Sequence, residues 1–286
     1  MSVRLVITDA MWDGIEPLMP ADPIRGRRWA DHRRTLEAIA WKYRTCSPWR
    51  DLPDELGSFQ TTHKRLIRWA VDGTWERILA ALLKVADAGD DIGWIVSVDS
   101  TVCRAHQHAA GARKKGFRIG LSQMPHALGR SRGGLSTKVH LVSDSDARPL
   151  VLRVTAGQAG DAPAFEAIMA GIRVSRSGPG SPKTRPDAVL ADRAYSSRAI
   201  RSHLRRRGIR AAIPQPSDQV GHRLRRGRTG GRRPAFDAET YKQRNAVERC
   251  INRFKQWRGL AMRTDKLATA YQAAFHLAAI LIWARR

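Results

Sequence analysis

Two short, mostly apolar segments, each ending in an aspartate, constrain the fold of this chain more than any other feature. They are Trp94–Asp99 (Trp-Ile-Val-Ser-Val-Asp) and Pro186–Asp192 (Pro-Asp-Ala-Val-Leu-Ala-Asp). Runs of this length and composition are typical of strands buried on both faces. An open α/β sheet places its ligand sites at the carboxyl ends of such strands. We therefore expect Asp99 and Asp192 to lie at strand ends, along one edge of a sheet.

The surrounding segments supply the rest of that sheet. Ser136–Ser143 and Pro149–Thr155 alternate in polarity and are joined by the turn Asp144–Arg148, which predicts a hairpin. Further elements follow along the chain: a helix Asp161–Ala170 capped by Asp161, the strand ending at Asp192, a helix after Ser196, and a short strand Ile209–Ile213. This order predicts a mixed five-stranded sheet with helices on both faces. It is the order of an RNase H-like fold, although the order alone does not exclude other α/β domains.

Residues 1–90 show helical periodicity instead, and we interpret them as a separate all-helical N-terminal domain. A basic turn at Arg25–Arg28 separates the first two expected helices. The helix beginning near Ser58 has the polar, basic composition of a recognition helix, which predicts helix-turn-helix-like binding in a DNA major groove. The alternative is a helical bundle whose basic face is only solvated. The residues that would face DNA are Thr62, His63, Arg65 and Arg68.

Residues Tyr241–Lys255 predict a single helix, because they contain neither Pro nor Gly and their apolar residues recur at helical spacing. These anchoring residues are Val247, Ile251 and Phe254. Polar residues four or seven apart fall on one face of such a helix. That polar row consists of Tyr241, Arg244, Glu248 and Lys255. Taken alone, the row is a solvated face with an Arg–Glu pair, but the two upstream aspartates make Glu248 a candidate third acid.

Asp99, Asp192 and Glu248 predict a metal site if the fold brings them together. Three neighbouring carboxylates repel one another and raise each other's pKa unless cations share the site. Hard oxygen ligands suit Mg²⁺, with Mn²⁺ as a substitute. Two such ions about 4 Å apart stabilise the attacking and leaving oxygens of a phosphodiester displacement, with water or a DNA 3′-hydroxyl as nucleophile. For either aspartate alone, the ordinary interpretation is a cap or turn residue after a strand.

The other three residues of the row receive supporting roles. We expect Arg244 and Lys255 to face phosphates or to hold Glu248 in place. We expect Tyr241 to orient Arg244 or to stack on DNA.

The charge of the chain points to a polyanionic partner. There are 51 Lys and Arg residues against 26 Asp and Glu, giving a net charge of +25. Nucleic acid is the commonest partner of so basic a protein. We interpret residues 214–234 as a mobile arginine-rich loop that becomes ordered on a phosphate backbone. Gly129–Gly134 is expected to be a flexible basic turn; it lacks the strand–turn–helix context and the lysine of a nucleotide-binding loop, so no nucleotide cofactor is expected. The phosphate contacts expected from these segments are Arg130, Arg132, Lys138, Arg225 and Arg226.

The compartment follows from what the sequence lacks. Three widely spaced cysteines without a CxxC pair fit a reducing cytosol. The N-terminus lacks the apolar region of a signal peptide, and the apolar tail Ala273–Ala284 is too short to span a bilayer. We expect a cytoplasmic, nucleoid-associated protein with no membrane contact.

These motifs carry a family resemblance. The spacing of Tyr241, Arg244, Glu248 and Lys255 matches the signature around the catalytic glutamate of bacterial insertion-sequence DDE transposases. Val98–His106 resembles the first-aspartate block of the fifth insertion-sequence family. Four other segments also resemble blocks of that family: Pro48–Pro53, Gly129–Lys138, Thr155–Asp161 and Ala191–Tyr195.

The resemblance implies an RNase H-like catalytic domain, here residues 91–286, that cleaves and joins DNA with Mg²⁺. The catalytic triad is then Asp99, Asp192 and Glu248. The expected partners are double-stranded DNA, both the terminal inverted repeats and the target, and a second copy of the chain as a homodimer on DNA. Two alternatives remain open: an RNase H-like endonuclease that cleaves without joining, and a catalytically silent DNA-binding repressor.

Overall fold

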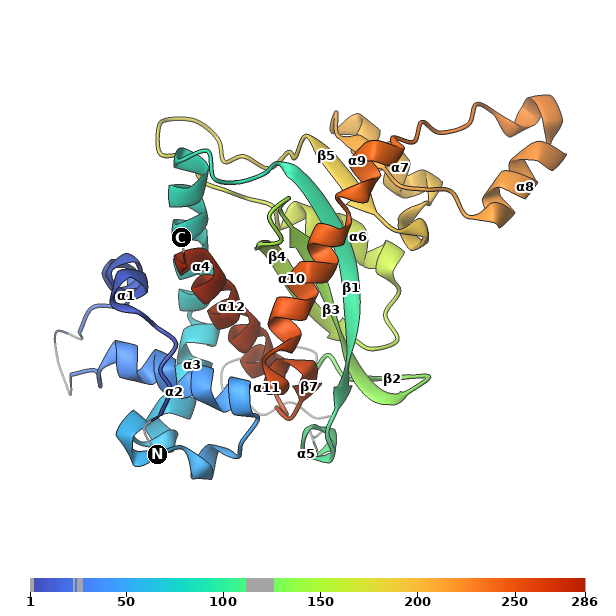
Figure 1. Cartoon of the computed structure of the whole chain (residues 1–286). Coiled ribbons are helices and arrows are strands. Elements are labelled where there is room, and N and C mark those ends of the chain that lie inside the picture. Colours follow the sequence, from blue (N-terminus) through green and yellow to red (C-terminus); the bar gives the residue numbers. More distant parts are fainter. Residues whose placement is uncertain (1–2, 23, 25–27, 112–125, 286) are drawn as a thin grey trace.

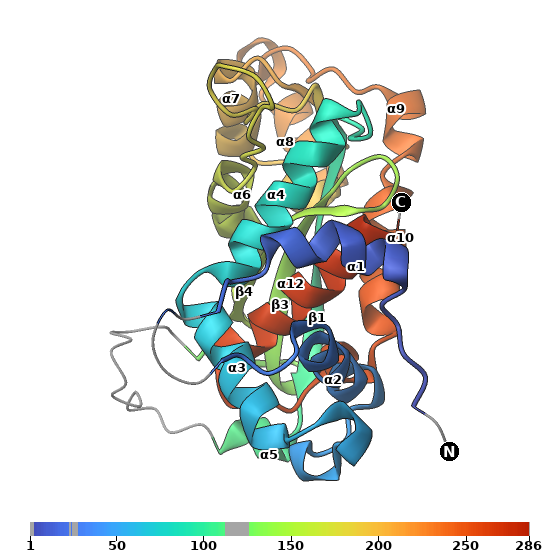
Figure 2. The same ribbon diagram turned by 90° about the vertical axis from the view of Figure 1, so that its left-hand side faces the viewer.

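The computed structural model (Figure 1) describes residues 3–22, 24, 28–111 and 126–285, in which a mixed β-sheet lies beside a group of N-terminal helices. Most of the basic turn expected at Arg25–Arg28 falls outside these residues. The helices α1–α4 and the strands lie on either side of the C-terminal helix α12 (Figures 1 and 2). The N-terminal residues are helical as expected, with Asp31 capping α2.

The five main strands form the expected mixed sheet, in the spatial order β4-β3-β1-β5-β6, with two further short strands at its margins. Strands β1, β3 and β4 pair antiparallel, whereas β1, β5 and β6 pair parallel. This is the RNase H-like arrangement. The strands are β1 Ile95–Ala105, β2 Gly129–Ser131, β3 Gly134–Ser143, β4 Pro149–Ala156, β5 Ala188–Ala191, β6 Arg210–Ala212 and β7 Met262–Arg263.

One expectation about the sheet was wrong: Asp99 does not end its strand. β1 continues to Ala105, because β3 pairs with it as far as Arg104↔Ser136. The parallel neighbour β5 does end at the expected level, with Ala191 opposite Val98. Asp99 therefore lies in the middle of the long strand, at the point where the sheet loses its parallel partner on one side.

The helices occupy both faces of the sheet and one end of the molecule. α10 and α12 contact the strands, as does α6, while α2, α3 and α4 pack on α12. The helices are α1 Asp9–Ile15, α2 His32–Thr45, α3 Phe59–Val71, α4 Thr74–Ala88, α5 Gln107–Ala110, α6 Asp161–Ala170, α7 Arg198–Arg206, α8 Ser217–Arg225, α9 Ala238–Lys242, α10 Asn245–Lys255, α11 Arg258–Ala261 and α12 Ala268–Ala284.

α12 joins the N-terminal helices to the sheet. It is buried nearly all round, and a single hydrophobic cluster extends from Ile7 to Trp283. At its end the Trp283 indole Nε1 donates a 2.7 Å hydrogen bond to the carbonyl oxygen of Pro149, the first residue of β4. The division into residues 1–90 and 91–286 remains a prediction, and the two parts share this one core.

The arginine-rich segment is ordered differently from expectation. Within residues 214–234 the chain forms helix α8 and a 3₁₀ turn, Gly227–Gly230, and not a loop without structure. Val220 and Leu224, four residues apart, give the segment a helical pattern that its glycines and arginines obscure in the sequence. α8 has no buried residue and projects from the body as an arm (Figure 1).

Across the described residues, none of the helices is both long enough and apolar enough to cross a membrane.

We predict that residues 1–90 do not fold when expressed alone. α3 and α4 bury Trp69 and Trp75 against a core that α12 completes, so the fragment would expose these rings to water. Near-ultraviolet circular dichroism should show the loss of fixed tryptophan packing. Joining residues 264–286 to the fragment through a flexible linker should restore it. A cooperative thermal transition in the unlinked fragment would contradict this prediction.

Candidate active site

The two aspartates are placed side by side by the register of β1 and β5. Ser97 pairs with Leu190 and Val98 with Ala191, so Asp99 and Asp192 are next in line. Side chains alternate between the faces of a strand. Asp99 therefore projects on the same face as Ser97, and Asp192 on the same face as Leu190. That face is the one covered by α9 and α10, since Tyr241 of α9 packs with Leu190.

Arg244 links the acid of β1 to the acid of α10. Its Nη2 lies 2.6 Å from Asp99 Oδ2 and its Nη1 lies 2.7 Å from Glu248 Oε1. The side chains of Arg244 and Asp99 are only 17% and 18% exposed, so water screens their ion pair weakly. Glu248 is 51% exposed, and its pair with Arg244 alone would contribute little. The expectation that Arg244 holds Glu248 in place agrees with this geometry.

The acids influence one another electrostatically. Burial raises the pKa of Asp99, while a hydrogen bond from the Ser100 N–H and the charge of Arg244 lower it. Asp192 and Glu248 raise the Asp99 pKa further, which places all three carboxylates in one electrostatic environment. Asp192 also accepts a 2.9 Å hydrogen bond from the Ala194 N–H, so it caps the 3₁₀ turn that follows it.

A cation site is not preformed by these acids. Among the described side chains, no three of His, Cys, Asp and Glu lie close enough together to hold a metal ion. One positive charge, the Arg244 guanidinium, already contacts two of the three acids.

The predicted single helix Tyr241–Lys255 is in fact two helices, α9 and α10, joined by a tight turn. The N–H groups of Arg244 and Val247 bond three residues back, to Tyr241 and Arg244, as in a 3₁₀ turn. Tyr241 packs in an apolar cluster on the sheet and lies 5.3 Å from the Phe236 ring. Its predicted stacking on DNA is not supported by this packing; it anchors the turn that presents Arg244. The cluster consists of Ile95, Ala188, Leu190, Ala212 and Tyr241.

Lys255 is exposed at the last position of α10. Its ammonium lies near Cys103, where burial raises the pKa of the thiol and Lys255 partly lowers it. Lys255 therefore lies near the face of β1 that carries Asp99, and within the described residues it forms no ion pair with the three acids.

Two of the four residues expected to read DNA from α3 are buried. The Thr62 hydroxyl donates to the Ser58 carbonyl oxygen at 3.1 Å. The Arg65 guanidinium lies 4.0 Å from the centre of the Trp29 ring and contacts His32 Nδ1 at 3.1 Å. These internal contacts leave neither side chain free for a groove, because the amphipathic pattern of α3 turns them inward. His63 and Arg68 are exposed.

The remaining basic residues are divided in the same way. Arg130 and Arg132 are exposed on a β2–β3 hairpin, which replaces the flexible turn expected there. Arg225 and Arg226 are exposed at the end of the α8 arm. Lys138 is only 12% exposed and forms a 3.0 Å ion pair with Asp161, so its charge is used internally rather than for phosphate.

The sequence interpretation gave no site role to Asp161, Ser100 or Tyr195, which lie immediately behind the acids. Asp161 had a visible signal, since it ends the block Thr155–Asp161, but it was interpreted only as a helix cap. In the structure Gly160 is the cap residue and the Asp161 side chain turns toward the sheet.

Comparison with known families accounts for nearly the whole chain. Residues 7–79 match a putative transposase family, IS4/5, and residues 91–283 match the transposase DDE domain. The second match covers more than half of the chain. The chain belongs to the DDE transposases. The family resemblance seen in the sequence is thereby confirmed, and the protein is a DNA-transposing transposase of the bacterial insertion-sequence type.

The chain is also similar to individual proteins. A putative transposase for insertion sequence element IS6501 from Brucella ovis is 30% identical over 151 residues, 53% of this chain and 100% of that protein. An uncharacterized protein, y4sN, from Sinorhizobium fredii is 38% identical over 116 residues, 40% of this chain and 88% of that protein. A solved structure, the Mos1 transposase paired-end complex with left transposon end, aligns over 87% of this chain and 83% of that one at 12% identity, but its TM-score of 0.25 supports no argument.

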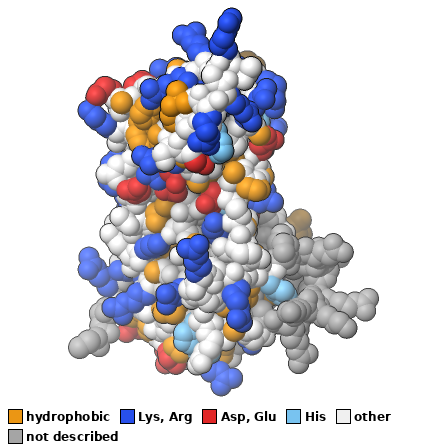
Figure 3. Space-filling view, turned by 90° about the vertical axis from the view of Figure 1, so that its right-hand side faces the viewer, with side chains coloured by type: hydrophobic (Ala, Val, Ile, Leu, Met, Phe, Trp, Pro, Cys, Tyr) orange, Lys and Arg blue, Asp and Glu red, His pale blue; other side chains and the backbone are white. Residues whose placement is uncertain are grey.

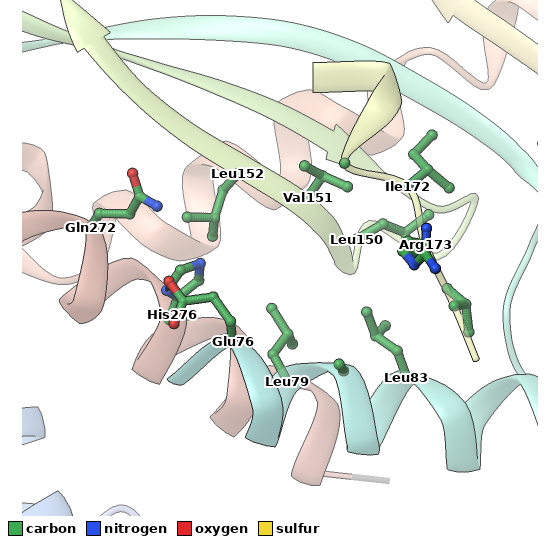
Figure 4. A pocket seen from close by; sticks show the side chains of 13 residues that line it. Glu76, Leu79, Leu83, Leu150, Val151, Leu152, Ile172, Arg173, Gln272 and His276 are labelled. Atoms are coloured by element: carbon green, nitrogen blue, oxygen red, sulfur yellow. Dashed lines mark ion pairs between the residues drawn. The ribbon is translucent and has the colours of Figure 1, made fainter. Parts of the chain in front are cut away.

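A hollow of about 280 Å³ in this transposase (Figure 4) has none of Asp99, Asp192 and Glu248 among its lining residues. It is bounded by leucines of α4 and β4, and Glu76 and His276 meet at one end of it. His276 Nδ1 is 3.5 Å from Glu76 Oε1. Burial lowers the pKa of His276 to about 4. The walls of the hollow are mostly apolar, so we assign the hollow no part in the chemistry.

We predict that this histidine makes the transposase less stable in mild acid. The unfolded chain binds a proton as the pH falls below 6.5, whereas folded His276 stays neutral down to about 4. The free energy of unfolding should therefore decrease across this window, by at most about 3 kcal/mol, and the Glu76 carboxylate should reduce the loss. Urea unfolding of His276→Asn should show a weaker pH dependence than the parent, while the exposed control His222→Asn should not. Equal slopes in all three proteins would contradict the assignment.

Proposed function

We propose that this transposase holds Mg²⁺, or Mn²⁺ in its place, with Asp99, Asp192 and Glu248, and so cleaves and joins DNA at the ends of its insertion sequence. One observation carries the proposal: two aspartates level on adjacent parallel strands face a helix whose glutamate is joined to one of them through Arg244. Such an arrangement is costly unless cations enter it.

The residues fit a divalent cation by their chemistry. All three acids offer the hard oxygen ligands that Mg²⁺ prefers. The Arg244 guanidinium between Asp99 and Glu248 marks a place where positive charge is favourable. When bound, two cations would stabilise the attacking and leaving oxygens of the phosphodiester displacement.

The basic residues of the site then act on the DNA. Arg244 neutralises the acids, presenting a planar guanidinium that suits phosphate as well as carboxylate. Lys255 is exposed and lies about two helical turns beyond Glu248. Its ammonium supplies a positive point charge for the phosphates of the strand that is cut. Tyr241 keeps the start of α10 against the sheet, which fixes the position of Arg244.

We assign DNA contact to three exposed basic groups in different parts of the chain. Figure 3, which views the molecule from the right-hand side of Figure 1, shows Lys and Arg side chains from one end of that side to the other, with acidic side chains mainly in its upper half and a few near the lower end. Phosphate contacts of this kind supply affinity but no sequence information. The partner is double-stranded DNA, terminal repeats and target, bound by a homodimer at the nucleoid. The groups are His63 and Arg68 of α3, Arg130 and Arg132 of the hairpin, and Arg225 and Arg226 of the arm.

The endonuclease alternative would use the same three acids, and a strand-transfer assay separates it from transposition. The silent repressor alternative is disfavoured because the three acids and Arg244 are all present, and Arg244 forms ion pairs with both Asp99 and Glu248.

We predict that Glu248→Gln retains DNA binding but loses cleavage by orders of magnitude. The substitution keeps the shape of the side chain and removes the charge that a cation requires. Nicking of a duplex carrying the element's own end, with Mg²⁺, should be measured beside a gel shift on the same DNA.

Lys255→Ala should give a milder defect in the same nicking assay, because Lys255 positions the strand without holding the ion.

The matched control is Glu239→Gln, which makes the same change of charge on the neighbouring helix α9, where Glu239 forms an ion pair with Lys242. Glu239→Gln should nick at the parental rate. If Glu248→Gln also does so, Glu248 is a surface residue paired with Arg244 and the metal mechanism is excluded.

We predict that Arg225→Ala combined with Arg226→Ala lowers the salt dependence of DNA binding. Each lost phosphate contact should reduce the log–log slope of affinity against salt by about 0.9. Fluorescence anisotropy over a salt series measures it. Arg173→Ala with Arg176→Ala removes two exposed arginines between α6 and β5 and serves as the control. An unchanged slope for the Arg225 and Arg226 pair would remove the α8 arm from the interface.

A further inference from the structure

A second group of polar side chains lies on the opposite face of the sheet, directly behind Asp99. Ser100 follows Asp99 in β1, so its side chain projects toward α6 and not toward α10. Its hydroxyl donates a 2.6 Å hydrogen bond to Asp161 Oδ1. Its backbone N–H donates a 2.7 Å hydrogen bond to Asp99 Oδ1. Ser100 therefore connects two carboxylates across the sheet.

Asp161 is itself held firmly. The Lys138 ammonium of β3 lies 3.0 Å from the same Oδ1 that accepts from Ser100. His140 Nδ1 is 3.9 Å from this oxygen, and the other ring nitrogen contacts the Thr155 hydroxyl at 2.8 Å. Burial lowers the pKa of His140, so Lys138 and not His140 supplies the positive charge near neutral pH. The carboxylate that meets Ser100 is thus fixed from β3 and from the start of α6.

The same cluster also reaches the turn that carries Asp192. Tyr195, three residues later, is buried and packs on Phe165 of α6, with ring centres 5.7 Å apart. Burial raises the pKa of the Tyr195 hydroxyl, and the charges of Asp161, Asp99 and Asp192 raise it further. The α6 helix therefore underlies both segments that bear the catalytic aspartates.

Asp99 needs this support because its strand is only partly paired at that level. β5 ends opposite Val98, and β7 joins β1 only at Arg104. Among the described residues, no strand pairs with Ser100 on this side of β1. A metal ligand, in contrast, must keep its oxygen within about 0.5 Å of the productive position. Ligating side chains are commonly oriented by hydrogen bonds from behind, and their loss costs metal affinity.

We propose that Asp161 is a positioning residue that, through Ser100, orients the Asp99 carboxylate for the divalent cation. The inference rests on the proposed function, in which Asp99 is a metal ligand. Lys138 belongs to the same device, since it fixes Asp161. A polar cluster that only stabilised the fold would hold the sheet and α6 together without affecting the affinity of Asp99 for a cation.

The test compares Ser100→Thr with Ser100→Val. Both variants place a β-branched side chain in the strand, but only Thr keeps the hydroxyl that donates to Asp161. Mn²⁺ alone is titrated into the full chain by calorimetry, and the folded fraction is checked by thermal denaturation. Ser100→Thr should keep the parental affinity. Ser100→Val should weaken it by about 10- to 100-fold. Equal affinity of the two variants would overturn the inference.

Asp161→Ala, which removes the oxygen that accepts from Ser100, provides an independent comparison if Ser100→Val does not fold. It should weaken Mn²⁺ binding in the parent but add nothing in a Ser100→Ala background, because the two residues act through one hydrogen bond. Additive losses would show that Asp161 acts by another route and would overturn the proposal. Thr155→Val, which touches His140 and not Ser100, is the control within the cluster and should bind as the parent does.

Asp99→Asn separates this inference from the proposed function. If Asp99→Asn does not reduce Mn²⁺ binding, Asp99 is not a ligand and the proposed function fails with the inference. If it does reduce binding while Ser100→Val and Ser100→Thr bind alike, only the positioning role of Asp161 is lost.

Discussion

Repulsion among three carboxylates is the physical constraint on which the rest of this structure depends. Burial already disfavours the charged form of Asp99, and Asp192 and Glu248 add to that penalty. The fold offsets it with one guanidinium, that of Arg244, which contacts the acid of the sheet and the acid of the helix at once. Without such a cation the site would favour protonated acids or a displaced α10. The proposed metal site, which needs several negative charges close together, is thus compatible with a folded chain.

The sheet sets the positions of Asp99 and Asp192, and Arg244 and Glu248, at the start of α10, add one positive and one negative charge beside them. Parallel pairing of β1 with β5 determines that Asp99 and Asp192 lie level, since one residue of slip would move one of them to the other face. The packing of Tyr241 on the sheet and the tight turn after α9 determine the position of Arg244. The polar cluster on the far face, centred on Asp161, holds the strand from behind. Rigid elements on both faces therefore converge on a few oxygen atoms.

Much of the fold could be predicted from hydrophobic patterns, because buried strands and their order leave strong signals. The succession of strands and helices along the chain, the mixed sheet and the aspartate after β5 followed in this way. What failed depended on contacts distant in sequence. β1 continues past Asp99 because β3 pairs with it, and Arg65 turns inward because Trp29 and Trp69 receive it. Lys138 was expected to contact phosphate, but its ammonium forms an ion pair with Asp161, a residue 23 positions away in the chain. The helical arm α8 was missed because its arginines and glycines concealed a short apolar spacing.

The burial of α12 between the N-terminal helices and the sheet also determines when the chain can fold. Residues near position 270 complete a core that begins at Ile7, so the first helices leave the ribosome long before their packing partner is made. Domains usually fold as units, N-terminal part first, during synthesis. Here the N-terminal helices cannot complete their packing until α12 has been synthesised. Until then Trp69 and Trp75 are accessible to chaperones. A truncated message that lacks α12 would therefore yield an N-terminal fragment without a stable fold.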